Sequence, residues 1–166
     1  RNRIEVGGGA LYDIGCYAVA SSRVVLEAEP QRVLSLIHRD PELKTDVLSS
    51  AILDFGTART VFTVATQMFP DQRVDIHGTS GRISVPNPFN TYPDVPSEMT
   101  VTTGLGTRVL RWDPVDQYAL LFDGFARAVR GEIEPPLSAA WSIGNMRTLD
   151  ALFRSEKSGN WEAIES

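Results

Sequence analysis

Small and hydrophobic residues recur at helical spacing over a segment that runs from Ala10 to about Glu27. The recurring positions are Leu11, Ile14, Ala18, Ser21 and Val25. Three glycines, at positions 7 to 9, precede the segment, and Pro30 lies just beyond its end, where proline commonly follows a helix. Further apolar residues at 19, 24 and 26 widen the stripe, so we expect this helix to be buried on more than one side.

Alternation between hydrophobic and polar residues replaces the helical period after residue 31, and it predicts β-strands. The expected strands cover residues 32–38, 47–55, 60–67, 74–77, 82–85, 98–103 and 108–112. Glycine-containing turns at 56–57, 78–81 and 104–106 join neighbouring strands, which is typical of an antiparallel meander. Four prolines within residues 86–96 predict an irregular loop between two of them.

Two further helices are expected near the end of the chain. The first has an apolar stripe formed by Tyr118, Leu121, Phe122, Phe125, Ala126 and Val129, and it ends at Gly131. The second runs from near Ser138 to Gly159, and one face carries Trp141, Asn145, Thr148, Leu149 and Leu152. This order predicts an α+β fold, in its simplest form an open, mainly antiparallel β-sheet with helices packed on one face.

The other face of such a sheet needs solvent or a partner. Alternation within residues 60–65 places Val61 and Ala65 on one face and Phe62 and Val64 on the other, so both faces carry apolar groups. Because helices cover only one face, we expect a homo-oligomer that forms through the sheet face.

The length of 166 residues accommodates one domain over residues 1–166. Its 42% hydrophobic and 22% charged residues are typical of a globular protein rather than of a disordered or fibrous one. A net charge of −5, with Lys44 and Lys157 as the only lysines, disfavours nucleic acid as a partner. No apolar run approaches the roughly 18–20 residues that cross a bilayer, so no membrane partner is expected.

Cysteine and histidine narrow the chemistry further. Cys16 is the only cysteine, which excludes an intramolecular disulfide and a cysteine-based zinc site and fits a cytoplasmic location. His38 and His77 fall on expected strands without partners at ligand spacing, so we expect no metal site. The run Gly104-Leu105-Gly106 lacks the third glycine and the following helix of a dinucleotide fingerprint, and it predicts a hairpin turn instead.

Asp13 and Tyr17 are the best candidates for chemistry. Their spacing of four residues puts both on one face of the first helix, and Gly9 lies four residues earlier on the same face. Without a side chain at Gly9, a ligand can approach the backbone closely. The structural alternative is that Asp13 only stabilises the helix N-terminus and that Tyr17 packs in the core with its hydroxyl satisfied.

The run from Gly7 to Tyr17 (GGGALYDIGCY) resembles the GGG-x-L-x-D-x-G-x-H/Y signature that opens the C-terminal domain of Gfo/Idh/MocA oxidoreductases. Residues 74–83 are similar to the family's strand–GT-x-G–strand hairpin, 118–131 to its F-x-x-A-(I/V)-x-G helix, and 137–153 to its closing helix. Tyr17 stands where many members have His. This resembles the subgroup of glucose–fructose oxidoreductase, NADP-dependent aldose dehydrogenases and dimeric dihydrodiol dehydrogenases.

The resemblance implies a substrate-binding and oligomerisation domain over residues 1–166. It also implies that an N-terminal Rossmann domain, which binds NADP or NAD and supplies a lysine from a Glu-Lys-Pro motif, is absent from this chain. Cofactor-binding residues are therefore not expected here. By resemblance, Asp13 and Tyr17 are catalytic, and Gly9, Asp13 and Tyr17 contact the substrate. Tyr17 would transfer a proton or orient the reacting oxygen, and Asp13 would hydrogen-bond a substrate hydroxyl or hold the polar network.

The implied activity is that of an NAD(P)-dependent dehydrogenase. Hydride would pass between nicotinamide and a hydroxyl or carbonyl of a sugar, polyol or cyclic diol, and the fragment alone would be inactive. The alternative, of a different class, is a non-catalytic α+β module for dimerisation or ligand binding. In that alternative Asp13 and Tyr17 have structural roles only.

Overall fold

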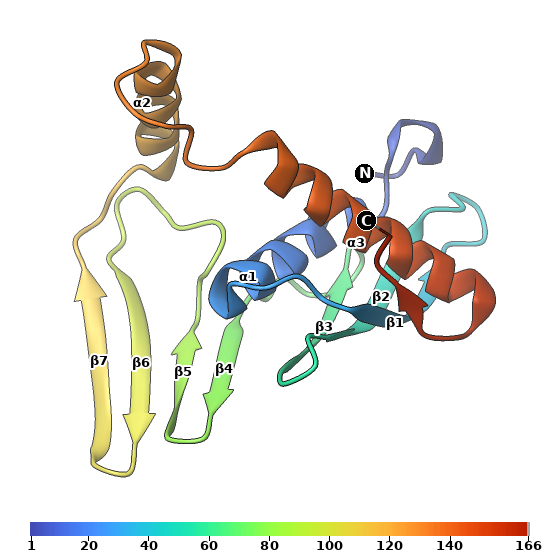
Figure 1. Cartoon of the computed structure of the whole chain (residues 1–166), viewed down its shortest axis with the longest axis horizontal. Helices are drawn as coiled ribbons and strands as arrows, with labels where there is room; N and C mark the ends of the chain where they lie inside the picture. Colours follow the sequence, from blue (N-terminus) through green and yellow to red (C-terminus); the bar gives the residue numbers. More distant parts are fainter. Residues whose placement is uncertain (166) are drawn as a thin grey trace. The chain divides into compact units, whose positions relative to one another are not determined.

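The first and last helices pack together on one face of a four-stranded sheet (Figure 1). The computed structural model describes residues 1–165. They divide into two compact units, a first unit formed by residues 1–68 with the segment from Leu137 onward, and a second unit formed by residues 69–136.

The sheet of the first unit has the order β3-β2-β1-β8, and all of its neighbours are antiparallel. Its strands are β1 (Arg32–Arg39), β2 (Asp46–Asp54), β3 (Arg59–Ala65) and β8 (Glu162–Ala163). The helical elements of this unit are a 3-10 turn (Ile4–Val6), a π turn (Leu11–Gly15), α1 (Cys16–Leu26) and α3 (Ala139–Ser158).

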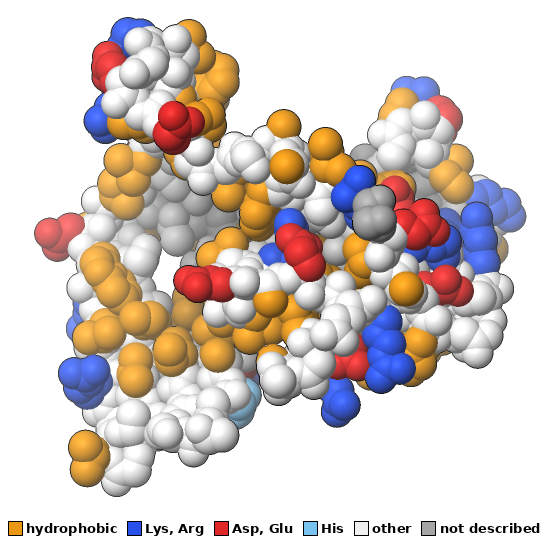
Figure 2. All heavy atoms as spheres, in the orientation of Figure 1, with side chains coloured by type: hydrophobic (Ala, Val, Ile, Leu, Met, Phe, Trp, Pro, Cys, Tyr) orange, Lys and Arg blue, Asp and Glu red, His pale blue; other side chains and the backbone are white. Residues whose placement is uncertain are grey.

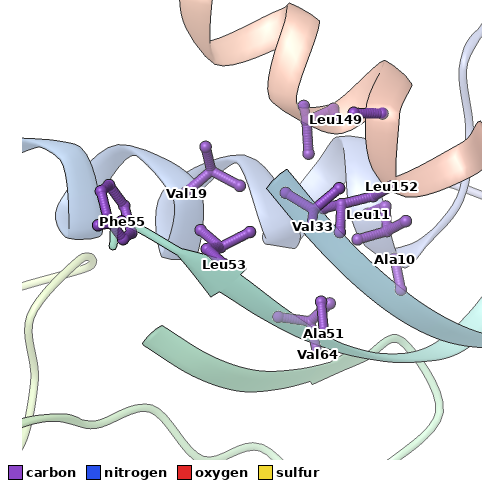
Figure 3. Packing of buried hydrophobic residues seen from close by; sticks show 11 residues of the cluster. Ala10, Leu11, Val19, Val33, Ala51, Leu53, Phe55, Val64, Leu149 and Leu152 are labelled. Carbon is purple, nitrogen blue, oxygen red and sulfur yellow. The ribbon is translucent and has the colours of Figure 1, made fainter. Parts of the chain in front are cut away.

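Strand register sorts the side chains of this sheet into an inner and an outer face. On the inner face, Val33 pairs with Leu53, and Ala51 lies between Ser35 and Phe62. Val33, Ala51 and Leu53 meet Leu11, Val19, Leu149 and Leu152 from the helices in one hydrophobic core (Figure 3). Burial of each large apolar side chain contributes roughly 1.5–3 kcal/mol, so the first unit has the core that holds the site in place.

The helix ends follow the sequence signals. Ser138 Oγ accepts a hydrogen bond of 3.1 Å from the Trp141 N–H at the start of α3, and Gly159 ends that helix with a φ of 67°. The first helix differs from the expectation of one regular helix from Ala10. It opens as a π turn, in which the Cys16 N–H donates to the Leu11 carbonyl, and becomes α-helical only from Cys16.

The second unit is an antiparallel meander in the order β4-β5-β6-β7, followed by one helix. Its elements are β4 (Val74–Gly78), β5 (Gly81–Val85), β6 (Ser97–Thr103), β7 (Gly106–Trp112) and α2 (Gln117–Val129). Asp116 caps α2, because its side chain accepts from the N–H groups of Tyr118 and Ala119. Residues 86–96 are irregular, as their prolines predict.

No residue of the second unit is buried, although all of residues 69–136 are described. One face of its sheet is apolar, with Ile76 beside Ile83 and Ile83 beside Val101, yet these side chains keep partial exposure. The apolar stripe of α2 is also exposed, with Phe122 and Phe125 each at 65%. Figure 2 shows hydrophobic side chains gathered on one side of α2.

The predicted α+β class and the antiparallel strands are confirmed, and the strands form two sheets. Helices pack on one face of the first sheet, whereas α2 carries no buried residue. Among residues 1–165, no helix combines the length and apolar character needed to cross a bilayer.

Candidate functional site

The glycine-rich entry places the candidate residues on the first turns of the helix. Asp13 lies within the π turn, and Tyr17 lies on the first turn of α1. The Asp13 N–H donates a hydrogen bond of 3.1 Å to the Gly9 carbonyl, so Gly9 and Asp13 are direct helical neighbours. The structure therefore places Asp13 and Tyr17 on one continuous stretch of helix, with Gly9 just before its start.

A buried carboxylate from β2 occupies the start of this helix. Asp46 is 1% exposed, and its Oδ2 accepts from the Leu11 N–H at 2.7 Å and from Ser49 Oγ at 3.1 Å. Negative charge at a helix N-terminus is favourable, and the bond to Leu11 satisfies one of the free N–H groups there. Asp46 thus fixes the point from which the helix carries Asp13 and Tyr17.

The closeness of the Asp46 carboxylate requires a glycine at position 9. Its φ of +127° is strained for any other residue, and a Cβ at this position would lie 1.9 Å from Asp46 Oδ1. Sequence reasoning identified Gly9 as a place of close approach and missed Asp46, whose carboxylate is what approaches. The only sequence signal for Asp46 is an acidic residue at the first position of a buried strand.

The Asp13 carboxylate is charge-compensated but incompletely hydrogen-bonded. Arg1 Nε lies 2.7 Å from Oδ2, and the Asp13 side chain is 31% exposed. Oδ2 itself is buried, and among the described residues no group donates a hydrogen bond of favourable geometry to it. A buried polar atom without a hydrogen bond costs about 1–3 kcal/mol, and the ion pair with Arg1 offsets part of that cost for Oδ2.

Tyr17 is 44% exposed, so it lies at the surface and is not part of the core. This differs from one part of the structural alternative, the expectation that Tyr17 packs in the core. The hydrophobic core is instead supplied by its neighbours on other faces of the helix, chiefly Leu11 and Val19.

A second tyrosine nearby serves as an internal comparison. Burial raises the pKa of the Tyr12 phenol above its usual value, and the carboxylate of Asp150, 3.5 Å from the hydroxyl, raises it further. Tyr12 therefore keeps its proton at neutral pH. It lines an open depression of about 360 Å³ with Arg39, Asp150 and Lys157, and neither Asp13 nor Tyr17 lines it.

Cys16, which lies between the two candidate residues in the sequence, is half-buried and packs against the hydrophobic core. Burial raises the pKa of its thiol, so the nucleophilic thiolate is disfavoured. His38 and His77 are exposed on β1 and β4. Among residues 1–165, no group of three or more His, Cys, Asp or Glu side chains could hold a metal ion.

Comparison with known proteins gives a consistent pattern. A family model described as the GFO/IDH/MocA C-terminal domain matches residues 1–84. Over 98% of its length the chain is 38% identical to an uncharacterized oxidoreductase, ORF334, of Rhizobium meliloti. Over 93% of its length it is 30% identical to a Haloferax volcanii protein named D-xylose 1-dehydrogenase (NADP(+)) 2. It covers 51% and 48% of these two proteins, so the chain spans about half the length of the curated relatives it matches.

Solved structures show the same fold at lower sequence identity. The 3-ketoreductase KijD10 of Actinomadura kijaniata, in complex with NADP and TDP-benzene, superposes with a TM-score of 0.82 at 21% identity, over 93% of this chain and 48% of that one. The aldose-aldose oxidoreductase of Caulobacter crescentus gives 0.78 at 19% identity, over 95% and 48%. The fold is thus the α+β half found in these oxidoreductases. The chain belongs to the Gfo/Idh/MocA family, and it matches that family's C-terminal domain.

Proposed function

We propose that this chain is the substrate-binding and oligomerisation domain of an NAD(P)-dependent oxidoreductase that acts on a hydroxyl or carbonyl of a sugar or polyol. The observation that carries the proposal is the similarity along 93% of the chain to a protein named D-xylose 1-dehydrogenase (NADP(+)) 2. A 1,5-anhydro-D-fructose reductase of Ensifer adhaerens, 22% identical over 99% of the chain, has a name of the same class.

The nucleotide itself would be held by a separate Rossmann domain that precedes these residues. The helix after the glycine run resembles a phosphate cradle through its glycines, and it does not fit one. Asp46 already caps its N-terminus through the Leu11 N–H, and a second anion there would be repelled. We therefore assign no cofactor-binding residue to this chain, and the choice between NADP and NAD belongs to the other domain.

Within the site, Asp13 would bind and Tyr17 would move the proton. The Asp13 carboxylate, whose side chain is 31% exposed, would accept a hydrogen bond from a substrate hydroxyl, which orients the sugar against the glycine-rich entry. Tyr17, being accessible, would exchange a proton with the reacting oxygen. Proton transfer by a phenol at neutral pH needs a neighbouring cation, and the family's Glu-Lys-Pro lysine would supply it.

Replacement of Tyr17 by Phe in the full-length enzyme tests this assignment. We expect kcat to fall by about 10²–10⁴-fold, the usual contribution of a proton-transfer group, with the nucleotide Kd unchanged. Tyr12→Phe is the matched control, because the raised pKa of Tyr12 makes it a poor proton acceptor. Equal activity of wild type and Tyr17→Phe would refute the role of Tyr17.

The competing function is a non-catalytic α+β module that dimerises or binds a ligand. The coding sequence upstream of Arg1 separates the two. A strand–GxGxxG–helix unit followed by Glu-Lys-Pro supports the enzyme, and an unrelated sequence supports the module.

We further propose that two copies associate through the outer face of the first unit's sheet. Leu34, Ile52 and Val61 form an apolar row across its three long strands, and Leu36 lies in the next row. Leu36 is 79% exposed and Val61 is 73% exposed. A matching face on a second copy covers both with the same residues, as a twofold interface requires. We also propose a cytoplasmic location, because the lone Cys16 forms no disulfide and suits a reducing compartment.

A further inference from the structure

Asn145 of α3 reaches the helix that carries Asp13 and Tyr17. Its Nδ2 donates a hydrogen bond of 3.2 Å to the Cys16 carbonyl, and its Oδ1 accepts one of 3.3 Å from Arg23 Nη1. The residue is 8% exposed, and both partners belong to α1. One side-chain amide therefore joins two points of α1 to α3.

The chemistry of the two partners fixes the orientation of this amide. A guanidinium has only donors, so the Asn145 oxygen must face Arg23, and the Asn145 nitrogen then faces the Cys16 carbonyl, which only accepts. A carboxylate of the same size would pair with Arg23 and repel the Cys16 oxygen. A hydrocarbon would leave both partners without a bond. An asparagine is therefore the side chain of this size that satisfies both.

Arg23 is itself held rigidly. Glu29 binds its guanidinium with two hydrogen bonds of 2.8 and 2.5 Å, and the Trp141 carbonyl accepts from Nη1 at 2.9 Å. The guanidinium lies 4.3 Å from the centre of the Trp141 ring. A Cβ on Gly144 would lie 2.6 Å from Nη2, so the glycine beside Asn145 makes room for the cation. Arg23 is therefore a rigid hydrogen-bond partner for Asn145.

The bond to Cys16 acts directly on Tyr17. The Cys16 carbonyl belongs to the planar peptide unit that ends in the Tyr17 nitrogen, so holding that oxygen restricts the backbone leading into Tyr17. This peptide unit follows the π turn, where the Cys16 N–H bonds to the Leu11 carbonyl. π geometry is rare and occurs mostly as single turns. A hydrogen bond from outside the helix therefore stabilises the junction between the π turn and α1.

We propose that Asn145 is a positioning residue, which holds the Cys16–Tyr17 peptide at the junction of the π turn and α1 and thereby aims the Tyr17 hydroxyl at the reacting oxygen. The tether stands on the contacts of this chain alone. Its consequence for catalysis rests on the proposed function.

Amide hydrogen exchange in the 166-residue chain tests the tether without reference to activity. Asn145→Asp keeps the size and the Arg23 contact but replaces the donor facing Cys16 with an acceptor. We expect the Tyr17 N–H to exchange at least about tenfold faster, as expected for loss of one buried hydrogen bond with a repulsive contact in its place. Its NMR resonance is expected to move as well.

Ser155→Ala is the matched control for both measurements. Ser155 is fully buried on the same helix, and its hydrogen bonds go to Asn160 and to the Ser35 N–H rather than to α1. Ser155→Ala should lower the melting temperature. It should leave the exchange rate of the Tyr17 N–H unchanged relative to the rates of neighbouring amides. The proposed tether is wrong if the exchange rate of the Tyr17 N–H is unchanged in Asn145→Asp. It is also wrong if Asn145→Asp and Ser155→Ala change that rate equally.

Kinetics of the full-length enzyme test the catalytic consequence. Asn145→Asp should lower kcat about 10- to 100-fold with KM for the nucleotide unchanged, because a small misplacement of a reacting group costs up to about 10² in rate. Ser155→Ala should retain kcat despite its lower melting temperature. A full kcat in Asn145→Asp overturns the positioning role. If the wild-type enzyme transfers no hydride, the proposed function fails, and the exchange experiment still decides the tether.

Discussion

A single buried carboxylate sets the start of the candidate site. Asp46 bonds to the Leu11 N–H and leaves no space for a side chain at Gly9. Neither effect involves chemistry with a substrate. Both determine where Asp13 and Tyr17 are presented, so the precision of the site depends on a residue that lies 35 positions away from the helix it caps.

Replacement of Gly9 by Ala should therefore destabilise the first unit by about 1–3 kcal/mol or more, since it combines an unfavourable φ with a clash against Asp46. Urea unfolding monitored by far-ultraviolet circular dichroism measures the change. Gly159→Ala is the control, because Gly159 also has a positive φ but no atom lies within 4 Å of its would-be Cβ. A Gly9→Ala cost no larger than that of the control would show that Asp46 yields to the added methyl group.

The difference between what was predicted and what was missed has a simple physical origin at this scale. Asp13 and Gly9 were recognisable because a charge and a glycine are unusual at their positions in an apolar helix. Asp46 and Asn145 were not recognisable as site residues. Their importance comes from partners 35 and 129 positions away, and no local pattern encodes such a pairing.

At the scale of elements, the sequence predicted correctly those features that residues close in the chain form together. The three hairpins lie where their glycine turns predicted, and α3 begins and ends at its predicted caps. The π turn was missed, because a spacing of four residues fits it about as well as an α-helix. The stripe of α2 was read correctly as amphipathic, but periodicity does not say whether a partner covers the stripe.

Truncation of one large apolar side chain on each of two helices, α3 and α2, should change the stability by different amounts. Leu149→Ala on α3 should cost about 2–5 kcal/mol, because Leu149 is fully buried. Phe125→Ala on α2 should cost less than about 0.5 kcal/mol in this chain, because Phe125 is 65% exposed. Thermal unfolding of both variants in one buffer gives the comparison. A large loss in Phe125→Ala would mean that α2 is packed in solution.

At the scale of the whole molecule, the sequence predicted the α+β class but not the division of the strands into two sheets. Antiparallel hairpins look alike whether they continue one sheet or begin another, since their turns carry no information on the neighbouring pair. The difference in burial between the two units is also a property of the whole molecule. The hydrophobic core lies in the first unit, and residues 69–136 contribute nothing to it.

The proposed interface between copies can be tested with one charge. Val61→Glu places a carboxylate in the apolar row of the outer face and should weaken association at least about a hundredfold, because like charges across an interface cost several kcal/mol. Light scattering over a concentration series measures it. Val6→Glu, at a residue 68% exposed in the 3-10 turn, is the control. A wild-type chain that stays monomeric at high concentration would rule out this interface.

The nucleotide assignment gives a second whole-molecule prediction. The 166-residue chain should bind NADP no more tightly than about millimolar, a free energy of about −4 kcal/mol, because Asp46 occupies the helix N-terminus. Isothermal titration calorimetry on the chain and on the full-length enzyme provides the comparison. Micromolar binding by the chain alone would contradict the assignment of the phosphates to another domain.

The bond between Cys16 and Asn145 also orders events during synthesis. The ribosome makes the helix that carries Asp13 and Tyr17 before α3, and the amide that tethers it is added 129 residues later. At roughly 5–20 residues per second, the helix waits several seconds or more for its partner. A nascent chain released before α3 would have both candidate residues and no support for the peptide between Cys16 and Tyr17. The site is therefore completed only when the last helix of this chain leaves the ribosome.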